Sequence, residues 1–162
     1  MCGMGWDADM MGAPEGLKKT VGWGAYAVEG ARHILKKPMR LRLSVDGGPE
    51  QHLHGRTVLI ANVGMLVAGL NLIPEAQGDD GLLDILVIDP SSPVDWARTT
   101  TGILLGRGAA DDPSRTHLRG REVIVSTGHA RGRQIDGDTV GDGHGFRVAV
   151  LDKALTVRVP TS

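Results

Sequence analysis

Acidic residues and glycines are packed together in the stretch RQIDGDTVGDG, from Arg133 to Gly143. Its three carboxylates are those of Asp136, Asp138 and Asp142. Glycine lets the backbone adopt positive φ and lets a ligand approach closely, and carboxylates can bind hard cations or accept a proton. The stretch is therefore compatible with a calcium loop, a solvated turn or the edge of an active site.

The calcium-loop interpretation fails on spacing. An EF-hand loop that began at Asp136 would have Asp138 and Gly141 at its positions 3 and 6, as required, but Val140 at position 5 and Arg147 at position 12. The following FRVAV is typical of a strand, whereas an EF-hand continues into a helix. A turn and an active-site edge remain open.

A second acidic loop, PEAQGDDGLLD at 74–84, lies between two expected strands. An Asp-Gly turn is one interpretation. The other is a hard-cation site, in which Asp80 and nearby carbonyl oxygens would supply ligands suited to Mg²⁺.

Other patterns that could carry chemistry are weaker. GMGWDA at 3–8 fits G-x-G-x-x-A, but two residues precede it and alternating βα units are missing, so a dinucleotide site is not expected. The sequence has no P-loop and no G-x-S-x-G elbow, and Cys2 has no identifiable base partner. His52 and His54 would share one side of a strand without a third ligand nearby in sequence, so an exposed hairpin edge is expected there.

Length and composition limit the class of protein. The 162 residues suggest one domain, and 24 glycines with only 3% aromatic residues indicate a turn-rich, β-rich domain with an aliphatic core. A formal net charge of −1 gives no electrostatic case for a nucleic-acid partner. A single cysteine, no apolar run of about 18 residues and no visible signal peptide lead us to expect a cytoplasmic location.

Positive charge is concentrated near the N-terminus. Between Lys18 and Arg42, seven basic residues stand against one acid, Glu29. The segment could be a solvated helix face, or a surface that meets anionic lipid or phosphate.

Apolar periodicity and turn residues predict the elements that must position these groups. A helix is expected over 17–37, a hairpin turn at Asp46-Gly47, and a second helix capped by Ser92 that runs from Pro93 to about Leu105. Strands are expected over 57–63, 82–89, 122–127, 132–136, 146–150 and 154–159. The aliphatic stretch 63–73 is more consistent with core than with a lipid-tail pocket. The opening MCGMGWDADMMG resembles the inside of a strand and turn, so an upstream part is expected to be missing.

Taken in order, the motifs are GWDAD, KKTVGWGAY, IAN, IPEAQGDDGLLDILVI, IDGD and ALTVRVP. This series resembles the C-terminal domain of the bacterial diacylglycerol kinase and lipid kinase family, which is related to the sphingosine kinases. The resemblance covers nearly the whole chain. Its most specific part is P-x-A-x-x-D-D-G-L-L-D, followed some fifty residues later by a D-G-acid turn.

The resemblance implies a mainly β fold for residues 1–162, a two-layer β-sandwich with two flanking helices. It implies transfer of the ATP γ-phosphoryl group to the hydroxyl of diacylglycerol or a similar lipid. Asp138 would be the catalytic base, and Mg²⁺ would be bound by Asp80 with main-chain oxygens of Gln77 and Leu82. Three further residues would support the site: Asp136, Asp79 and Lys18.

The sequence departs from the family pattern at two points. The nucleotide motif G-G-D-G-T is absent, so we expect a partial chain, inactive alone, with ATP bound mainly by a missing N-terminal domain. The turn reads D-G-D where the family has D-G-E. A non-catalytic lipid-binding or regulatory module, or a kinase for another hydroxyl, therefore remains an alternative. A kinase would meet its lipid at the inner membrane surface, as a transient peripheral protein.

Overall fold

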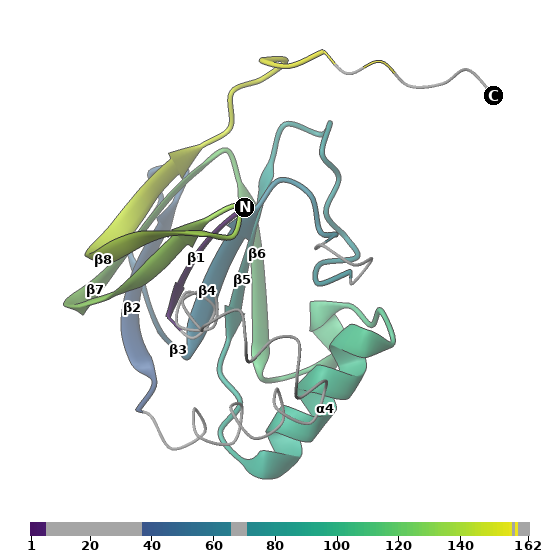
Figure 1. Cartoon of the computed structure of the whole chain (residues 1–162), viewed down its shortest axis with the longest axis vertical. Helices are drawn as coiled ribbons and strands as arrows, with labels where there is room; N and C mark the ends of the chain where they lie inside the picture. The colour runs from purple at the N-terminus through teal and green to yellow at the C-terminus, as the bar shows by residue number, and fades with distance from the viewer. Residues whose placement is uncertain (6–36, 66–70, 157, 159–162) are drawn as a thin grey trace.

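The computed structural model describes residues 1–5, 37–65, 71–156 and 158, and these form a mainly β domain (Figure 1). The mainly β prediction is confirmed: within these ranges the strands are accompanied by a single α-helix, α4 (Pro93–Leu104), and a short 3₁₀ helix, η2 (Ala109–Asp111). The other expected helix, over 17–37, falls almost wholly outside the described residues, as does Lys18.

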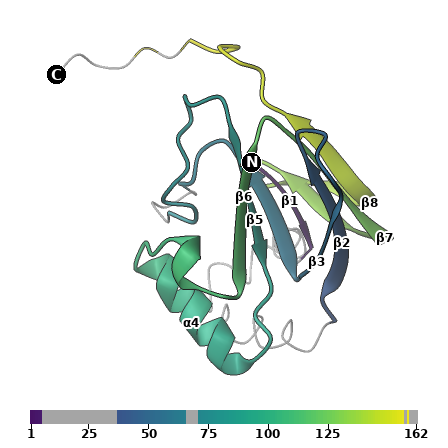
Figure 2. The same cartoon turned by 180° about the vertical axis from the view of Figure 1, so that it is seen from behind.

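One antiparallel sheet carries the fold. In the part of the chain described, its order is β3-β2-β7-β1-β4-β5-β6, and β8 pairs with β7. The strands are β1 (Cys2–Gly5), β2 (Met39–Val45), β3 (Gln51–Gly55), β4 (Thr57–Ala61), β5 (Leu83–Ile88), β6 (Arg115–Gly120), β7 (Glu122–Ile135) and β8 (Asp138–Ala149). The sheet curls, so that the β7–β8 hairpin folds over one side while α4 lies beside β5 and β6 (Figures 1 and 2). Strand β1 has antiparallel partners on both sides, unlike the first strand of a dinucleotide-binding unit.

Two apolar clusters hold the sheet in place. The larger fills the inside of the curl and includes Met4, Leu41 and Ile85. The smaller covers the other face of β4 and β5, where Leu72 and Ile73 pack with Leu59, Ala61, Leu86, Ile88 and Ala109. The expectation of core for 63–73 is therefore confirmed for its last two residues, whereas Val63 and Met65 are 56% and 61% exposed.

The β2–β3 hairpin forms where the sequence predicts it. Asp46 and Gly47 both have positive φ, 52° and 68°, and Gly48 N donates to Val45 O at 2.9 Å. Such a turn matches the right-handed twist of the flanking strands, which is why Asp-Gly favours it.

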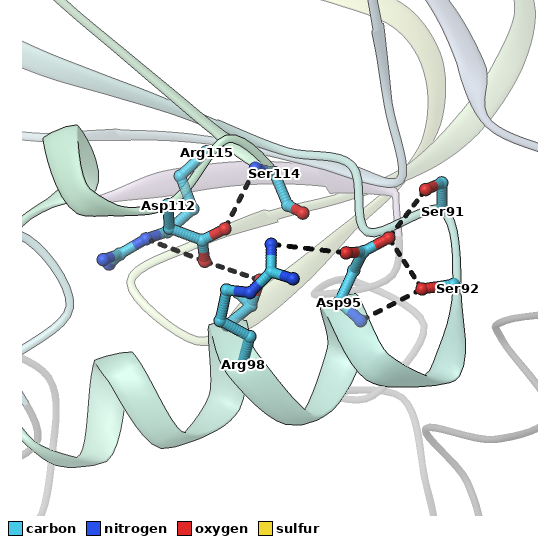
Figure 3. A network of polar contacts seen from close by, with 8 residues as sticks. Ser91, Ser92, Asp95, Arg98, Asp112, Ser114 and Arg115 are labelled. Carbon is cyan, nitrogen blue, oxygen red and sulfur yellow. Dashed lines mark hydrogen bonds and ion pairs between the residues drawn. The ribbon is translucent and has the colours of Figure 1, made fainter.

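Helix α4 begins at its predicted cap. Ser92 Oγ accepts a hydrogen bond from Asp95 N at 3.1 Å, and Pro93 follows as the first helical residue. The hydroxyls of Ser91 and Ser92 donate to Asp95 Oδ2 at 2.7 and 2.8 Å (Figure 3). These bonds, with the nearby Arg98 guanidinium, lower the pKa of Asp95.

A buried polar group, here called the helix anchor (Thr99, Asp112 and Arg115), ties α4 to the start of β6. Thr99 Oγ1 donates to Asp112 Oδ2 at 2.7 Å, and Arg115 Nε lies 3.5 Å from the same oxygen. Asp112 Oδ1 accepts from Ser114 N at 3.0 Å (Figure 3). The helix is thus fixed by hydrogen bonds as well as by apolar packing.

Four strand predictions need correction. The strand expected over 146–150 is the end of the 12-residue β8 (Asp138–Ala149). β6 was not predicted, because its sequence RTHLRG has a single large apolar residue. The strands expected at 122–127 and 132–136 are one 14-residue strand, in which register shifts near 126–131 interrupt the periodicity. The strand expected over 154–159 is absent at residues 154–156 and 158, where the structure describes the chain, and Leu155 is 80% exposed.

Candidate functional site

The turn that contains the predicted base is a tight hairpin. Asp136 and Gly137 have φ of 49° and 94°, and Ile135 at the end of β7 pairs with Asp138 at the start of β8. Gly137 N donates to the side-chain oxygen of the fully buried Gln134 at 2.9 Å. Asp138 is therefore an exposed carboxylate on a turn whose backbone is held by the buried Gln134 side chain.

Asp136 attaches this turn to the beginning of β1. Its main-chain N donates to Met1 O at 2.8 Å, and its Oδ1 accepts a hydrogen bond from the Met1 amino group. Asp136 thus makes a structural contact, and the side chain of Asp138 is left facing solvent.

Hydrogen bonds and a salt bridge attach the second acidic loop to the sheet. Asp80 Oδ1 accepts from Leu82 N at 2.9 Å, and Asp80 Oδ2 forms a salt bridge with Arg119 Nη2 of β6. Asn62, just after β4, donates through Nδ2 to Gly78 O at 3.1 Å. The side chain of Asp80 is 19% exposed as a result, so this carboxylate has a defined position.

Next to Asp80, three polar side chains from β5 and β6 contact one another. Asp84 is fully buried, and its Oδ1 lies 2.8 Å from His117 Nε2 and 3.2 Å from Arg119 Nε. Arg119 therefore bridges Asp80 and Asp84. We call these four residues, Asp80, Asp84, His117 and Arg119, the loop cluster.

Two buried oxygens beside this loop have no hydrogen-bond donor among the described residues: Asp84 Oδ2 and Asn62 Oδ1. Buried acceptors without donors are costly, and carboxylate, amide and carbonyl oxygens are the ligands that Mg²⁺ prefers. Oxygen atoms of the kind that Mg²⁺ prefers therefore lie in this region, but the described residues contain no cluster of three His, Cys, Asp or Glu side chains that could hold a metal ion. At the expected ligands, Leu82 N–H donates to Asp80 Oδ1, and Gln77 O accepts a hydrogen bond from Asp80 N at 3.5 Å. Asp79 is exposed.

The sheet brings the two acidic loops to the same edge without contact between them. Ile135 of β7 pairs with Cys2, Cys2 with Ile60, and Ile60 with Ile85 of β5. The end of β7 and the start of β5 are thus three strand spacings apart, about 14 Å. Asp138 and Asp80 consequently face the same end of the sheet from either side of β1 and β4.

Sequence reasoning missed Asp84, His117 and Arg119. Asp84 had a signal, because it is a charged residue inside the otherwise apolar strand LDILVI. His117 and Arg119 had none, since their strand was not predicted. Cys2 needs no functional role: burial raises the pKa of its thiol, and Asp136 raises it further, while the N-terminal charge lowers it.

Comparison with known proteins decides the family. Residues 1–159 match the model of the YegS C-terminal NAD kinase beta sandwich-like domain. The chain belongs to this family. A probable lipid kinase YegS-like protein of Xanthomonas euvesicatoria pv. vesicatoria (strain 85-10) is 28% identical over 149 residues, which is 90% of this chain and 47% of that protein.

Solved structures agree on the fold. A putative diacylglycerol kinase from Bacillus anthracis str. Sterne matches with a TM-score of 0.66 at 15% identity, over 93% of this chain and 49% of that one. Another putative diacylglycerol kinase from the same organism gives 0.59 at 18% identity, again over 93% and 49%. The chain thus spans about half the length of the proteins that it matches. Within the residues described, no helix is long and apolar enough to cross a bilayer.

Proposed function

We propose that this chain is the lipid-side half of a kinase that phosphorylates the hydroxyl of diacylglycerol or a similar lipid alcohol. Family membership supports a kinase domain. The observation that carries the proposal further is the shared sheet edge, where a rigid turn presents Asp138 and a pinned loop presents Asp80. ATP would be bound mainly by a nucleotide-binding domain outside this chain, and the enzyme would work at the cytoplasmic face of the inner membrane.

In the proposed reaction, Asp138 accepts the proton of the lipid hydroxyl while the hydroxyl oxygen forms a bond to the γ-phosphorus of ATP. The bond from the γ-phosphorus to the bridging oxygen breaks, and ADP leaves with that oxygen. Asp138 is one methylene shorter than the glutamate of the family pattern, so its fixed turn must bring the backbone closer to the hydroxyl. Asp136 would keep that turn attached to β1, and Lys18 would belong to the same polar network.

Mg²⁺ would be held by Asp80 with main-chain oxygens of Gln77 and Leu82, and Asp79 would add negative charge at the rim. The unpaired oxygens of Asp84 and Asn62 place further acceptors beside this loop. When bound, the ion offsets the negative charge of the phosphates. Arg119 and Leu82 N–H orient the Asp80 carboxylate.

The test is ATP-dependent phosphorylation of diacylglycerol in neutral detergent micelles. The chain would be assayed alone and joined to a nucleotide-binding domain of the same family. We expect activity only in the joined protein, and Asp138→Asn should lower kcat at least 100-fold, the smaller end of the effect of a general base. Asp142→Asn is the matched control, because Asp142 is an exposed carboxylate on the same hairpin.

A joined, folded protein that phosphorylates no lipid alcohol would refute the proposal. The D-G-D turn favours one second candidate, a non-catalytic lipid-binding module. That module would show no phosphate transfer, and its affinity for diacylglycerol would be unchanged by Asp138→Asn.

A further inference from the structure

Two basic features that are separate in the sequence meet on one face of the β2–β3 hairpin. Arg40 of β2 lies directly opposite His54 of β3, and Arg42 lies opposite His52. Side chains directly opposite in an antiparallel pair point to the same face. We call these four residues the cationic ladder.

The ladder faces away from the core. Along β2, Met39, Leu41 and Leu43 are buried, while the alternate residues Arg40 and Arg42 are exposed. His52 and His54 are exposed on β3, which ends the main strand order of the sheet. The ladder surrounds an open hollow of about 420 Å³, lined by Arg40, Leu41, Arg42, His52, Leu53, His54 and Gly128.

Negative charge is scarce around the ladder. Across the ranges that the structure describes, neither arginine forms an ion pair with a carboxylate, and the one acid at a ladder residue is Glu50, whose Oε1 is 3.5 Å from His52 Nε2. An arginine opposite a histidine gains no ion pair from the strand pairing. Nothing in the packing of the core requires arginine at these outward positions. The two arginines therefore have no negatively charged partner among the described residues, and a binding partner could supply one.

We propose that the cationic ladder docks this domain on the surface of an anionic membrane. The choice of a membrane as partner rests on the proposed function, since a lipid substrate lies in a bilayer. An exposed basic face can meet several anionic headgroups at once, and each basic side chain near such a surface adds about 1 kcal/mol. Strands β2 and β3, which carry the ladder, lie at the opposite end of the strand order from β5 and β6, beside which α4 lies (Figures 1 and 2).

The experiment is co-sedimentation of this chain with vesicles, without nucleotide or diacylglycerol. Vesicles of 30% phosphatidylglycerol in phosphatidylcholine are compared with pure phosphatidylcholine, at low and at 0.5 M salt. We expect partitioning into the anionic vesicles only, weakened by salt because exposed charges are screened. Arg40→Gln/Arg42→Gln should lower the partition coefficient about 25-fold, five-fold for each arginine.

The matched control is Arg98→Gln/Arg107→Gln, which removes the same charge from exposed positions on and just after α4. It should lower partitioning less than two-fold, and circular dichroism and thermal melting should show that both double variants are folded. Equal losses in the two variants, or equal binding to neutral vesicles, would overturn the proposal. Tighter binding to a DNA duplex than to anionic vesicles would assign the face to nucleic acid instead.

Absence of binding to every vesicle would also overturn it, and would leave the ladder as charge that protects an edge strand from aggregation. Because the kinase assay uses neutral micelles, the two proposals can fail separately. A ladder variant that loses vesicle binding should keep its phosphorylation of diacylglycerol in micelles once joined to the nucleotide-binding domain.

Discussion

The helix anchor and the loop cluster both pair an arginine with a carboxylate at β6, yet they differ in what is left unpaired. In the helix anchor, both oxygens of Asp112 accept hydrogen bonds from Thr99 and Ser114. In the loop cluster, Oδ2 of the fully buried Asp84 has no donor among the described residues. The two arginines differ as well: Arg115 is 1% exposed and Arg119 39%.

A carboxylate whose acceptors are all satisfied has no remaining demand for a ligand, so the helix anchor is expected to serve stability. A buried oxygen without a donor attracts a cation, a proton or an ordered water. The helix anchor instead has an excess of donors, since two buried nitrogens of Arg115, Nε and Nη1, are left without a hydrogen-bond acceptor there. We therefore expect the Asp112–Arg115 pair to serve stability and the Asp84–Arg119 pair to lie at a ligand site, and the following experiments distinguish the two roles.

The largest effect is expected in the helix anchor. Asp112→Ala leaves the guanidinium of Arg115 buried without its carboxylate, which typically costs about 3–5 kcal/mol of unfolding free energy. Urea denaturation measures the loss. Asp111→Ala, at an exposed neighbouring acid, should change stability by less than about 0.5 kcal/mol. A loss in Asp112→Ala as small as in this control would mean that the pair is not structural.

The loop cluster should respond to Mg²⁺ while the helix anchor does not. Mg²⁺ at ten times its Kd should stabilise the wild-type chain by about 1.4 kcal/mol, seen as a higher Tm. Asp84→Asn should lower stability by about 1–3 kcal/mol, because a buried charge-assisted contact is weakened, and should abolish the Mg²⁺ response.

Two controls make the Mg²⁺ response specific. Asp80→Asn should also remove it, whereas the destabilised Asp112→Ala should keep the full increase in Tm. If Asp112→Ala loses the response too, the ion stabilises the fold generally and the loop cluster is not its site.

The sequence predicted the parts of this fold that depend on local chemistry. The hairpin turn at Asp46-Gly47 follows from residues that adopt positive φ easily, and the start of α4 follows from its Ser-Pro cap. The family pattern identified the two acidic loops. None of these predictions needs knowledge of distant contacts.

The loop cluster depends on such contacts and was missed. Asp84 and Arg119 are neighbours only because β5 pairs with β6, which lies beyond α4 in the sequence, and β6 carries too few apolar residues to be recognised. The cationic ladder is intermediate: His52 and His54 were placed on an exposed hairpin edge, but their register with Arg40 and Arg42 came from the structure.

The cap of α4 is a third, more exposed polar contact, and the loss of stability on removing it can be compared with the losses expected in the helix anchor and the loop cluster. Ser92→Ala removes the acceptor for Asp95 N and one of two hydroxyl donors to the Asp95 carboxylate. The expected loss is about 1 kcal/mol, or about 2–4 °C in Tm for a chain of this size. Ser91→Ala removes a donor but not the cap, so its loss should be smaller. Equal losses would show that the carboxylate contacts matter more than the cap.

The smallest effect is the pH dependence of this cap. Hydrogen bonds from Ser91 and Ser92 hold the pKa of Asp95 below its usual value in the folded chain. Folding therefore favours the ionised carboxylate, and this contribution is present above the unfolded pKa of about 3.9 and is lost as the pH falls through the lower folded pKa. The stability difference between wild type and Ser92→Ala should accordingly be constant from pH 5 to 7 and shrink below about pH 4. A difference that grows on acidification would mean that the serine hydroxyls favour the protonated carboxyl, and would reverse the direction of the shift.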